Sequence, residues 1–297
     1  MIRFPGWLFF QAVGFVLSLL TIPSHAAGRV ECSSLKTTKV PSGQVGYCAL
    51  LPPSYGADGT NRAQGAKFPV LYLLHGLGDN QESLINTGAW SEVEQLQEDK
   101  KIGEFAIITP NGGNSFYLDS KNGRVKYESF LVQEFIPAME RKYRVGGSRA
   151  ARAISGVSMG GYGALRLAFK FPHMFSSVSA HSAALIERLP LGIGNVGASL
   201  SYIGPAFGTP PDAAYWQQNS PFAFARKSEL KGLKIYFDCG RNDEYGFDSG
   251  AESLDKLLTT RKIAHEFHIY PGGHGLEYFM RHFPASLEFH SKAFGLK

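Results

Sequence analysis

Residues 156–160 carry the residue types of a nucleophilic site. The segment reads Gly156-Val157-Ser158-Met159-Gly160, a G-x-S-x-G pattern between an apolar stretch, residues 151–155, and a helix-like run, residues 160–171. This setting predicts a sharp strand-to-helix turn that exposes the Ser158 hydroxyl. A Cβ at either glycine would collide with the chain as it doubles back. The alternative is a chance match in a loop, since the chain has 34 glycines.

A serine hydroxyl is a weak nucleophile, so Ser158 needs a general base, and that base needs a carboxylate to orient it. The best candidate base is His274, because the glycines on both sides of it let a loop carry the imidazole over a sheet edge. His181 is the main rival, since it follows a predicted strand. It precedes every plausible acid, however, which favours His274.

The carboxylate is expected from the acidic segment around residue 243. Asp243 lies in the loop after an apolar strand, where a carboxylate can reach the histidine, whereas Asp238 still lies within that strand. We therefore favour Asp243 and keep Asp238 as the alternative. The resulting chain order of serine, acid and histidine is that of the triad in the α/β-hydrolase topology.

Two loops are candidates for stabilising the negative oxygen that forms when a serine attacks a carbonyl. Such an oxyanion needs preorganised donors, usually two backbone N–H groups. We expect one from Met159, directly after the serine, and one from Leu77, with His75 in a structural hydrogen bond. Nearby aromatic residues are candidates for a substrate pocket, with a place in the core as the alternative: Trp90, Tyr117 and Tyr162, together with Phe116.

The elements that must position these groups alternate between short apolar strands and longer amphipathic stretches. This alternation predicts an α/β fold with a mostly parallel central sheet and helices on both faces. Strands are expected at residues 44–52, 68–74, 104–109, 151–155, 175–180, 233–239 and 265–270. Helices are expected at residues 81–99 with a break at 87–88, at residues 127–143 with a bend at Pro137, and at residues 160–171. Two more helices are expected, one that extends through residue 257 and one at the end of the chain.

The first 26 residues have the pattern of a cleaved signal peptide. Arg3 gives a positive start, residues 7–20 are largely apolar, and Ser24-His25-Ala26 offers small residues before the cleavage point. An uncleaved membrane anchor is less favoured, because the apolar run is shorter than the ~20 residues of a spanning helix. We expect a secreted or periplasmic protein with one catalytic domain, residues 27–297, and an insertion at about residues 185–212, which are rich in Gly and Pro.

The sequence does not decide whether two of the three cysteines form a disulfide. Cys32 and Cys48 could pair in an oxidising compartment. Folding about the turn signal Pro41-Ser42-Gly43, however, places Cys48 opposite residue 36 or 37 and not opposite Cys32. Cys239, at the end of an apolar strand, is expected to be a buried small hydrophobic residue.

Charge and ligand spacing argue against several classes of partner. The formal net charge of +5 comes from scattered basic residues, which indicates an ordinary surface and no nucleic-acid partner. No His/Cys cluster has the spacing of a zinc site, so we expect no metal and no cofactor. No stretch after the signal is long and apolar enough for stable membrane insertion.

Taken together, the motifs resemble a known family, the secreted "putative esterase" group. The resemblance rests on residues 73–79, 156–165, 238–243 and 271–274 and spans roughly residues 45–295. The group also contains esterase D (S-formylglutathione hydrolase), bacterial feruloyl esterases and the mycolyltransferases. The resemblance implies Ser158 as nucleophile, Asp243 as acid and His274 as base, with Leu77 and Met159 at the oxyanion hole.

Three functional hypotheses follow. The first is a serine carboxylic-ester hydrolase acting through an acyl-enzyme on a small-molecule or polysaccharide-linked ester, with feruloyl and acetyl esters suggested by the family. The second passes the same acyl group to an acceptor alcohol, as a mycolyltransferase does, and a thioesterase like S-formylglutathione hydrolase is a variant that the export signal disfavours. The third, a non-catalytic binding protein, should lack a triad member, and none is missing. The oligomeric state is left open.

Overall fold

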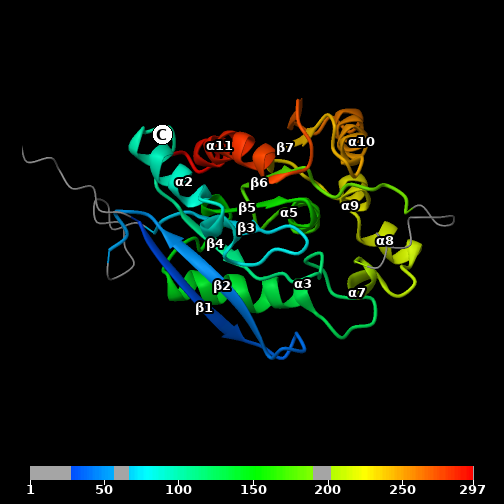
Figure 1. Cartoon of the computed structure of the whole chain (residues 1–297), viewed down its shortest axis with the longest axis horizontal. Coiled ribbons are helices and arrows are strands. Elements are labelled where there is room, and N and C mark those ends of the chain that lie inside the picture. The colour runs from blue at the N-terminus through cyan, green and yellow to red at the C-terminus, as the bar shows by residue number, and fades with distance from the viewer. Residues whose placement is uncertain (1–27, 57–66, 190–201, 297) are drawn as a thin grey trace, which may run out of the picture.

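The computed structural model describes residues 28–56, 67–189 and 202–296. The expected signal peptide and the middle of the expected insertion lie outside these ranges. The described residues form one sheet with the strand order β1-β2-β4-β3-β5-β6-β7-β8 (Figure 1). Its strands are β1(Arg29–Lys36), β2(Gln44–Leu51), β3(Val70–Leu74), β4(Ala106–Pro110), β5(Arg152–Val157), β6(Ser177–His181), β7(Lys234–Gly240) and β8(Glu266–Tyr270).

The sheet is mostly parallel, as the sequence predicts. Strands β3 to β8 run parallel, and β1 and β2 form an antiparallel hairpin that joins the sheet through β4. Strand β3 is buried at every position, because both faces of the sheet are covered and neither needs a polar side. Its alternate residues enter two separate hydrophobic clusters, with Tyr72 in one and Leu71 in the other.

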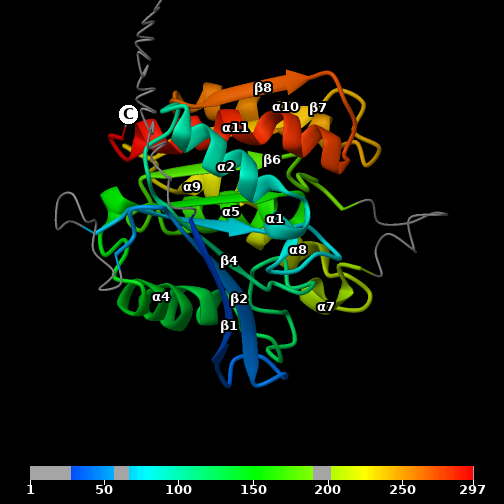
Figure 2. The ribbon, with the colours of Figure 1, turned by 60° about the vertical axis from the view of Figure 1, so that its left-hand side comes forward.

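Helices cover both faces (Figures 1 and 2). On one face, α2(Ala89–Glu98) and α11(Leu276–Ala293) lie side by side and bury Val93 and Phe283. The other face is covered by α5(Met159–Lys170), which contacts α9(Pro221–Lys227), with α10(Phe247–Thr260) against β7. The other short α-helices in the described ranges are α1(Ser83–Asn86), α3(Tyr127–Phe130), α4(Ile136–Lys142), α7(Gly204–Phe207) and α8(Ala213–Asn219).

The expected helix break is confirmed, and a π-helical segment lies where a bend at Pro137 is expected. The predicted helix at residues 81–99 breaks at Gly88, whose φ of 77° is left-handed. The predicted helix at 127–143 contains α3, a π-helical segment at Leu131–Phe135 and α4, with Pro137 in the first turn of α4. Because proline lacks an N–H and its ring clashes with the carbonyl four residues earlier, the wider π-helical turn accommodates it.

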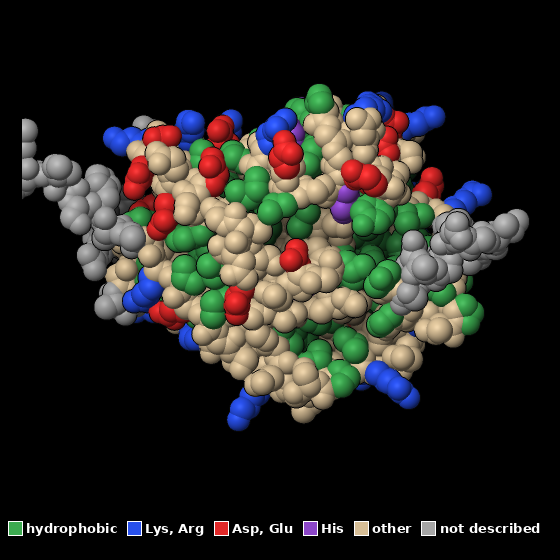
Figure 3. Space-filling model, viewed as in Figure 1, with side chains coloured by type: hydrophobic (Ala, Val, Ile, Leu, Met, Phe, Trp, Pro, Cys, Tyr) green, Lys and Arg blue, Asp and Glu red, His purple; other side chains and the backbone are tan. Residues whose placement is uncertain are grey.

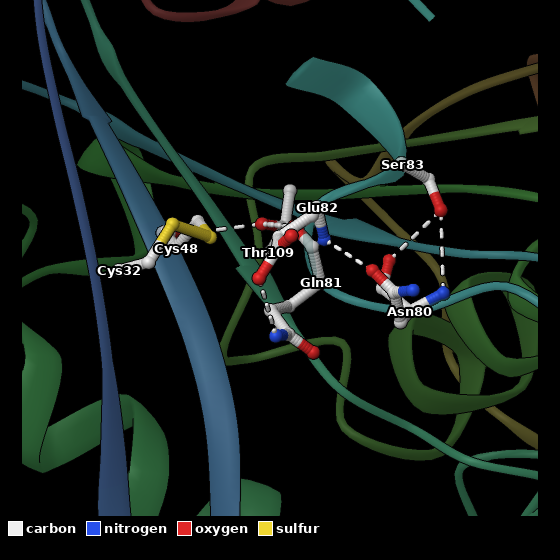
Figure 4. Close-up of a disulfide and its surroundings, with 7 residues drawn as sticks. All are labelled: Cys32, Cys48, Asn80, Gln81, Glu82, Ser83 and Thr109. Atoms are coloured by element: carbon white, nitrogen blue, oxygen red, sulfur yellow. Dashed lines mark hydrogen bonds between the residues drawn. A yellow bond between two sulfur atoms is a disulfide. The ribbon is translucent and has the colours of Figure 1, made fainter. Parts of the chain in front are cut away.

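Cys32 and Cys48 form a disulfide across the β1–β2 hairpin (Figure 4), which settles the pairing that the sequence left open. The two residues are directly opposite, so the expected register of Cys48 against residue 36 or 37 is wrong. The connecting loop is wider than a turn at 41–43, since the Thr37 N–H donates to the Gly43 carbonyl. Thr37 is also held by Glu134, at 2.6 Å, so a contact remote in sequence sets the loop.

The hairpin is tied to the segment that leads into α1. The Thr109 hydroxyl on β4 lies 2.6 Å from the Gln81 carbonyl and 3.3 Å from the carbonyl of Cys48 (Figure 4). This contact connects the disulfide-bearing strand with the loop that follows β3. No helix in the part of the chain that the structure describes is both long and apolar enough to cross a membrane.

Candidate active site

Three side chains that are far apart in the sequence meet at the carboxyl ends of parallel strands. Ser158 follows β5, Asp243 follows β7 and His274 follows β8. His274 Nε2 lies 2.8 Å from Ser158 Oγ, and His274 Nδ1 lies 2.7 Å from Asp243 Oδ2. The ionised Asp243 accepts a hydrogen bond from Nδ1–H, which leaves Nε2 without a proton and able to accept the proton of the serine hydroxyl.

Ser158 occupies a strained turn between β5 and α5. Its φ of 54° and ψ of −115° are uncommon for a residue with a side chain. The neighbouring strand end fixes this conformation, because the Ser158 N–H donates to the His181 carbonyl at 2.9 Å and the Ser158 carbonyl accepts from Ala184 at 3.0 Å. Strain held in this way at a half-buried serine that lines a cavity is typical of a functional turn.

The two motif glycines have the steric role that the sequence predicts. A Cβ on Gly156 would lie 2.2 Å from the backbone carbon of Gly160, and a Cβ on Gly160 would lie 2.0 Å from the Leu74 carbonyl oxygen. Both obstacles are backbone atoms, which cannot rotate away. The close approach of β3, β5 and α5 therefore depends on these glycines.

We expect Gly160→Ala to lower the free energy of unfolding by more than about 4 kcal/mol, because the new methyl group overlaps the Leu74 backbone. Denaturant unfolding of the purified variant, or loss of soluble protein, measures this effect. Gly275→Ala is the matched control, since Gly275 has an ordinary φ of −78° and no neighbouring atom within 4 Å of the new Cβ. Equal stabilities of the two variants would contradict the steric argument.

Asp243 is held by several donors at the end of β7. Burial alone would raise its pKa, but the hydrogen bond and charge of His274, with N–H groups from Tyr245 and Phe247, hold the pKa of Asp243 below its usual value. The carboxylate is therefore ionised at neutral pH, as its orienting role requires. The Sγ atom of the free, buried Cys239 lies 3.5 Å from Asp243 Oδ2, the oxygen that contacts His274.

The rival residues form a second, separate pair. His181 Nδ1 and Asp238 Oδ2 lie 2.9 Å apart, poorly aligned for a hydrogen bond, and both side chains are fully buried. Asp238 also accepts from the Tyr278 hydroxyl at 2.9 Å, and His181 Nε2 lies 2.8 Å from Ser286 Oγ. Among the described contacts, His181 reaches Ser158 through its backbone carbonyl, and its side chain lies with Asp238 in the core.

The loop after β3 lies beside the serine. Leu77, which is 38% exposed, and Met159 line the same cavity as Ser158. Met159 is the first residue of α5, so its N–H has no acceptor within the helix. His75 is buried and structural, as expected. Its Nδ1 lies 2.7 Å from the Gly76 carbonyl, its Nε2 accepts from Gly112 at 2.8 Å, and burial lowers its pKa.

A cavity of about 850 Å³ opens over Ser158 and His274. Its walls are largely apolar and come from the loops after β3, β4, β6, β7 and β8. They include the described ends of the expected insertion, at Ile186, Leu189, Tyr202 and Ile203. A largely apolar cavity of this size with a few convergent polar groups fits a small-molecule substrate.

The aromatic residues proposed for the pocket lie in the core. Trp90, Tyr117 and Tyr162 are at most 9% exposed, and none of them is among the described residues that line the cavity. The Tyr117 hydroxyl donates to the His75 carbonyl and that of Tyr162 to the Asn219 carbonyl, so each polar end is used inside the fold. Phe116, the fourth aromatic candidate for the pocket, does line the cavity, as does Trp216.

Three contacts around His274 were not predicted from the sequence. Glu244 Oε2 accepts a hydrogen bond from the His274 backbone N–H at 2.7 Å. The rings of Tyr245 and Phe247 pack edge-on against the imidazole, with centroids 4.7 and 5.3 Å away. The acidic loop directly after Asp243 is visible in the sequence, but only the folded chain shows that this loop contacts both the backbone and the ring of His274.

The described residues contain no group of three or more His, Cys, Asp or Glu side chains that could hold a metal ion. The arrangement that they do contain is a nucleophile, a base and an orienting acid, open to a cavity. That combination can attack a carbonyl and form a covalent acyl intermediate.

Comparison with known proteins places this geometry in a family. Residues 40–290 match the family described as "Putative esterase". The chain belongs to this esterase family. An esterase of Mycobacterium tuberculosis is 30% identical over 250 residues, which cover 77% of this chain and 52% of the relative. An acetyl esterase of Caldicellulosiruptor saccharolyticus is 28% identical over 75% of this chain and 83% of its own length.

Solved structures support the fold of this esterase family member. A ferulic acid esterase superposes with a TM-score of 0.75 at 27% identity, covering 90% of this chain and 99% of the other. The expected α/β-hydrolase fold and the family resemblance are both confirmed. The chain spans about half the length of the Mycobacterium tuberculosis relative.

Proposed function

We propose that this protein is a serine carboxylic-ester hydrolase whose catalytic residues are Ser158, His274 and Asp243. The observation that carries the proposal is the continuous chain of contacts from Asp243 Oδ2 to His274 Nδ1 and from His274 Nε2 to Ser158 Oγ, at 2.7 and 2.8 Å. The family match and the esterase names of the relatives support it.

The reaction has two halves. Ser158 Oγ bonds to the ester carbonyl carbon while its proton moves to His274 Nε2, and the carbonyl oxygen becomes an oxyanion beside the N–H groups of Leu77 and Met159. The C–O bond to the alcohol then breaks, and the alcohol leaves with the proton from Nε2. Water attacks the acyl-enzyme by the same route, which releases the acid and restores Ser158.

Feruloyl and acetyl esters of polysaccharides are the proposed natural substrates. The ferulic acid esterase and acetyl esterase named among the similar proteins support this choice. We also propose that the protein works outside the cytosol, where such esters occur. The Cys32–Cys48 disulfide supports that location, since disulfides persist in oxidising compartments.

Initial rates on p-nitrophenyl acetate, butyrate and octanoate and on methyl ferulate test the proposal. We expect turnover that Ser158→Ala abolishes, and the preferred chain length will measure the acyl pocket. A folded wild type that turns over none of these esters would contradict ester hydrolysis. Product analysis with and without an added acceptor alcohol separates hydrolysis from acyl transfer, because only a transferase makes the new ester in high yield.

A further inference from the structure

The charge of the cavity wall is one-sided. Among the described lining residues two are acidic, Asp79 and Glu244, and none is Lys or Arg. On the face that Figure 3 shows, the basic side chains lie mainly near the outline, while the middle carries hydrophobic and neutral side chains with a few acids. An incoming substrate therefore meets carboxylates without a neighbouring cation.

Both carboxylates lie close to the reacting groups. Asp79 Oδ2 and Ser158 Cβ each lie within 4 Å of the point that a Cβ on Gly76 would occupy, so these two atoms are less than 8 Å apart. Glu244 is bonded to the backbone N–H of His274 at 2.7 Å. The two acids thus flank Ser158 and His274, Asp79 from the loop after β3 and Glu244 from the loop after β7.

Arginines on the segments around the cavity do not line its described wall. Arg226 pairs with Glu187, and Arg241 pairs with Glu252 at 2.6 Å. Arg188 is exposed and does not line the described cavity. The sequence of residues 190–201 contains no Lys or Arg, so that segment cannot supply a cation either.

We propose that Asp79 and Glu244 are specificity-determining residues that make this site select neutral or cationic esters and discriminate against anionic ones. The inference rests on the proposed ester hydrolysis and names the substrate class of that site. A carboxylate, phosphate or sulfate on the substrate loses hydration on entry, finds no basic partner and is repelled by two like charges. The oxyanion that forms in the reaction adds a third negative charge to the site.

This charge pattern separates the candidate substrates. Acetyl and feruloyl esters of neutral sugars carry no anionic group, so they fit the site. A glutathione thioester carries carboxylates that would need a basic partner, which the described cavity wall does not offer. The proposal therefore favours polysaccharide esters over a substrate of the S-formylglutathione type.

Three acetate esters that differ mainly in charge provide the test: those of 3-hydroxybenzamide, 3-hydroxybenzoate and 3-hydroxyphenyltrimethylammonium. Each kcat/KM is divided by the rate of hydroxide hydrolysis, which corrects for the leaving group. We expect the neutral ester to exceed the anionic one by at least about tenfold, and the cationic ester to be at least as good as the neutral one. A ratio near one for the wild type would overturn the proposal.

Charge-neutralising variants identify the residues responsible. We expect Asp79→Asn with Glu244→Gln to bring the neutral-to-anionic ratio close to one, whatever the overall rate. The amide oxygen of the glutamine can still accept the His274 N–H. Glu229→Gln is the matched control, because Glu229 is also exposed and accepts a backbone N–H, from Lys231, but lies outside the described cavity wall. We expect it to leave the ratio unchanged.

Ionic strength gives an independent readout. Raising it from 0.01 to 1 M shortens the Debye length from about 30 to about 3 Å, so the wild-type ratio should fall while that of the double variant stays constant. A double variant that keeps the wild-type ratio would overturn the assignment to these two acids. If the neutral ester is not hydrolysed at all, the proposed function itself fails, so the two failures are distinguishable.

Discussion

Replacement of Ser158 by alanine is expected to lower kcat by about a millionfold, the loss typical of a missing nucleophile in a triad. The variant keeps the Cβ and loses one hydroxyl, whose contact is with His274. The fold should therefore survive, with a change in unfolding free energy within about 1 kcal/mol. Steady-state rates on p-nitrophenyl butyrate, with denaturant unfolding of the same preparation, measure both effects.

Covalent labelling identifies the nucleophile directly. A serine-directed phosphonate ester should add one phosphonyl group to the wild type and none to Ser158→Ala, as read by intact mass. Ser83→Ala is a suitable comparison, because Ser83 also lines the cavity but donates its hydroxyl to the Asn80 carbonyl. Labelling of Ser158→Ala, or loss of kcat below tenfold, would assign the chemistry to another residue.

The second large effect is expected for Asp243→Asn, which should lower kcat by about 10⁴-fold. An asparagine amide can donate to His274 Nδ1, and this favours the tautomer with a proton on Nε2. That nitrogen then cannot accept the Ser158 proton. Rates on the same ester measure the loss, and an effect smaller than tenfold would show that Asp243 does not orient the base.

Asp238→Asn separates the two acids that the sequence could not fully separate. Asp238 contacts His181 and Tyr278 and has no contact with His274 among those described, so kcat should fall by less than about tenfold. Instead, the free energy of unfolding should fall by about 1–3 kcal/mol, because the buried contacts of Asp238 with Tyr278 and His181 are weakened. A loss of kcat equal to that of Asp243→Asn would contradict this division of roles.

The pH dependence of the free energy of unfolding should also reflect the environment of Asp243. Since the folded pKa of Asp243 lies below its usual value, the ionised group stabilises the folded state at neutral pH. That contribution is lost as the pH falls from the ordinary carboxyl range, near about 4, through the lower folded pKa. The stability difference between wild type and Asp243→Asn should therefore shrink on acidification, as denaturant unfolding at several pH values would show.

Local sequence patterns were sufficient for the framework of this molecule. The apolar strand runs are read correctly because a strand buried on both faces has a composition that few other elements share. Among the described strands, only β1 was not predicted as a strand, since it is an edge strand with mostly exposed residues. The break at Gly88 was predicted, and Pro137 was expected to bend its helix, because glycine and proline act through their own backbone geometry.

The side-chain environment required the tertiary structure. Trp90, Tyr117 and Tyr162 lie near the right loops in sequence but point into the core, because their direction depends on packing against elements remote in the chain. The hairpin register that joins Cys32 to Cys48 was missed for a similar reason, since Thr37 is held by Glu134, 97 residues away. Neither the packing of these aromatic side chains nor the contact between Thr37 and Glu134 leaves a pattern in the local sequence.

The sequence by itself determined the order and identity of the triad candidates, because a strained serine turn and a glycine-flanked histidine are local features of the chain. Only the tertiary structure decided that Asp243 and not Asp238 faces His274, and that Glu244 supports the histidine and joins Asp79 in the cavity wall. The physical reason is that parallel strands bring their carboxyl ends to one edge, where small differences in loop path set which charges meet.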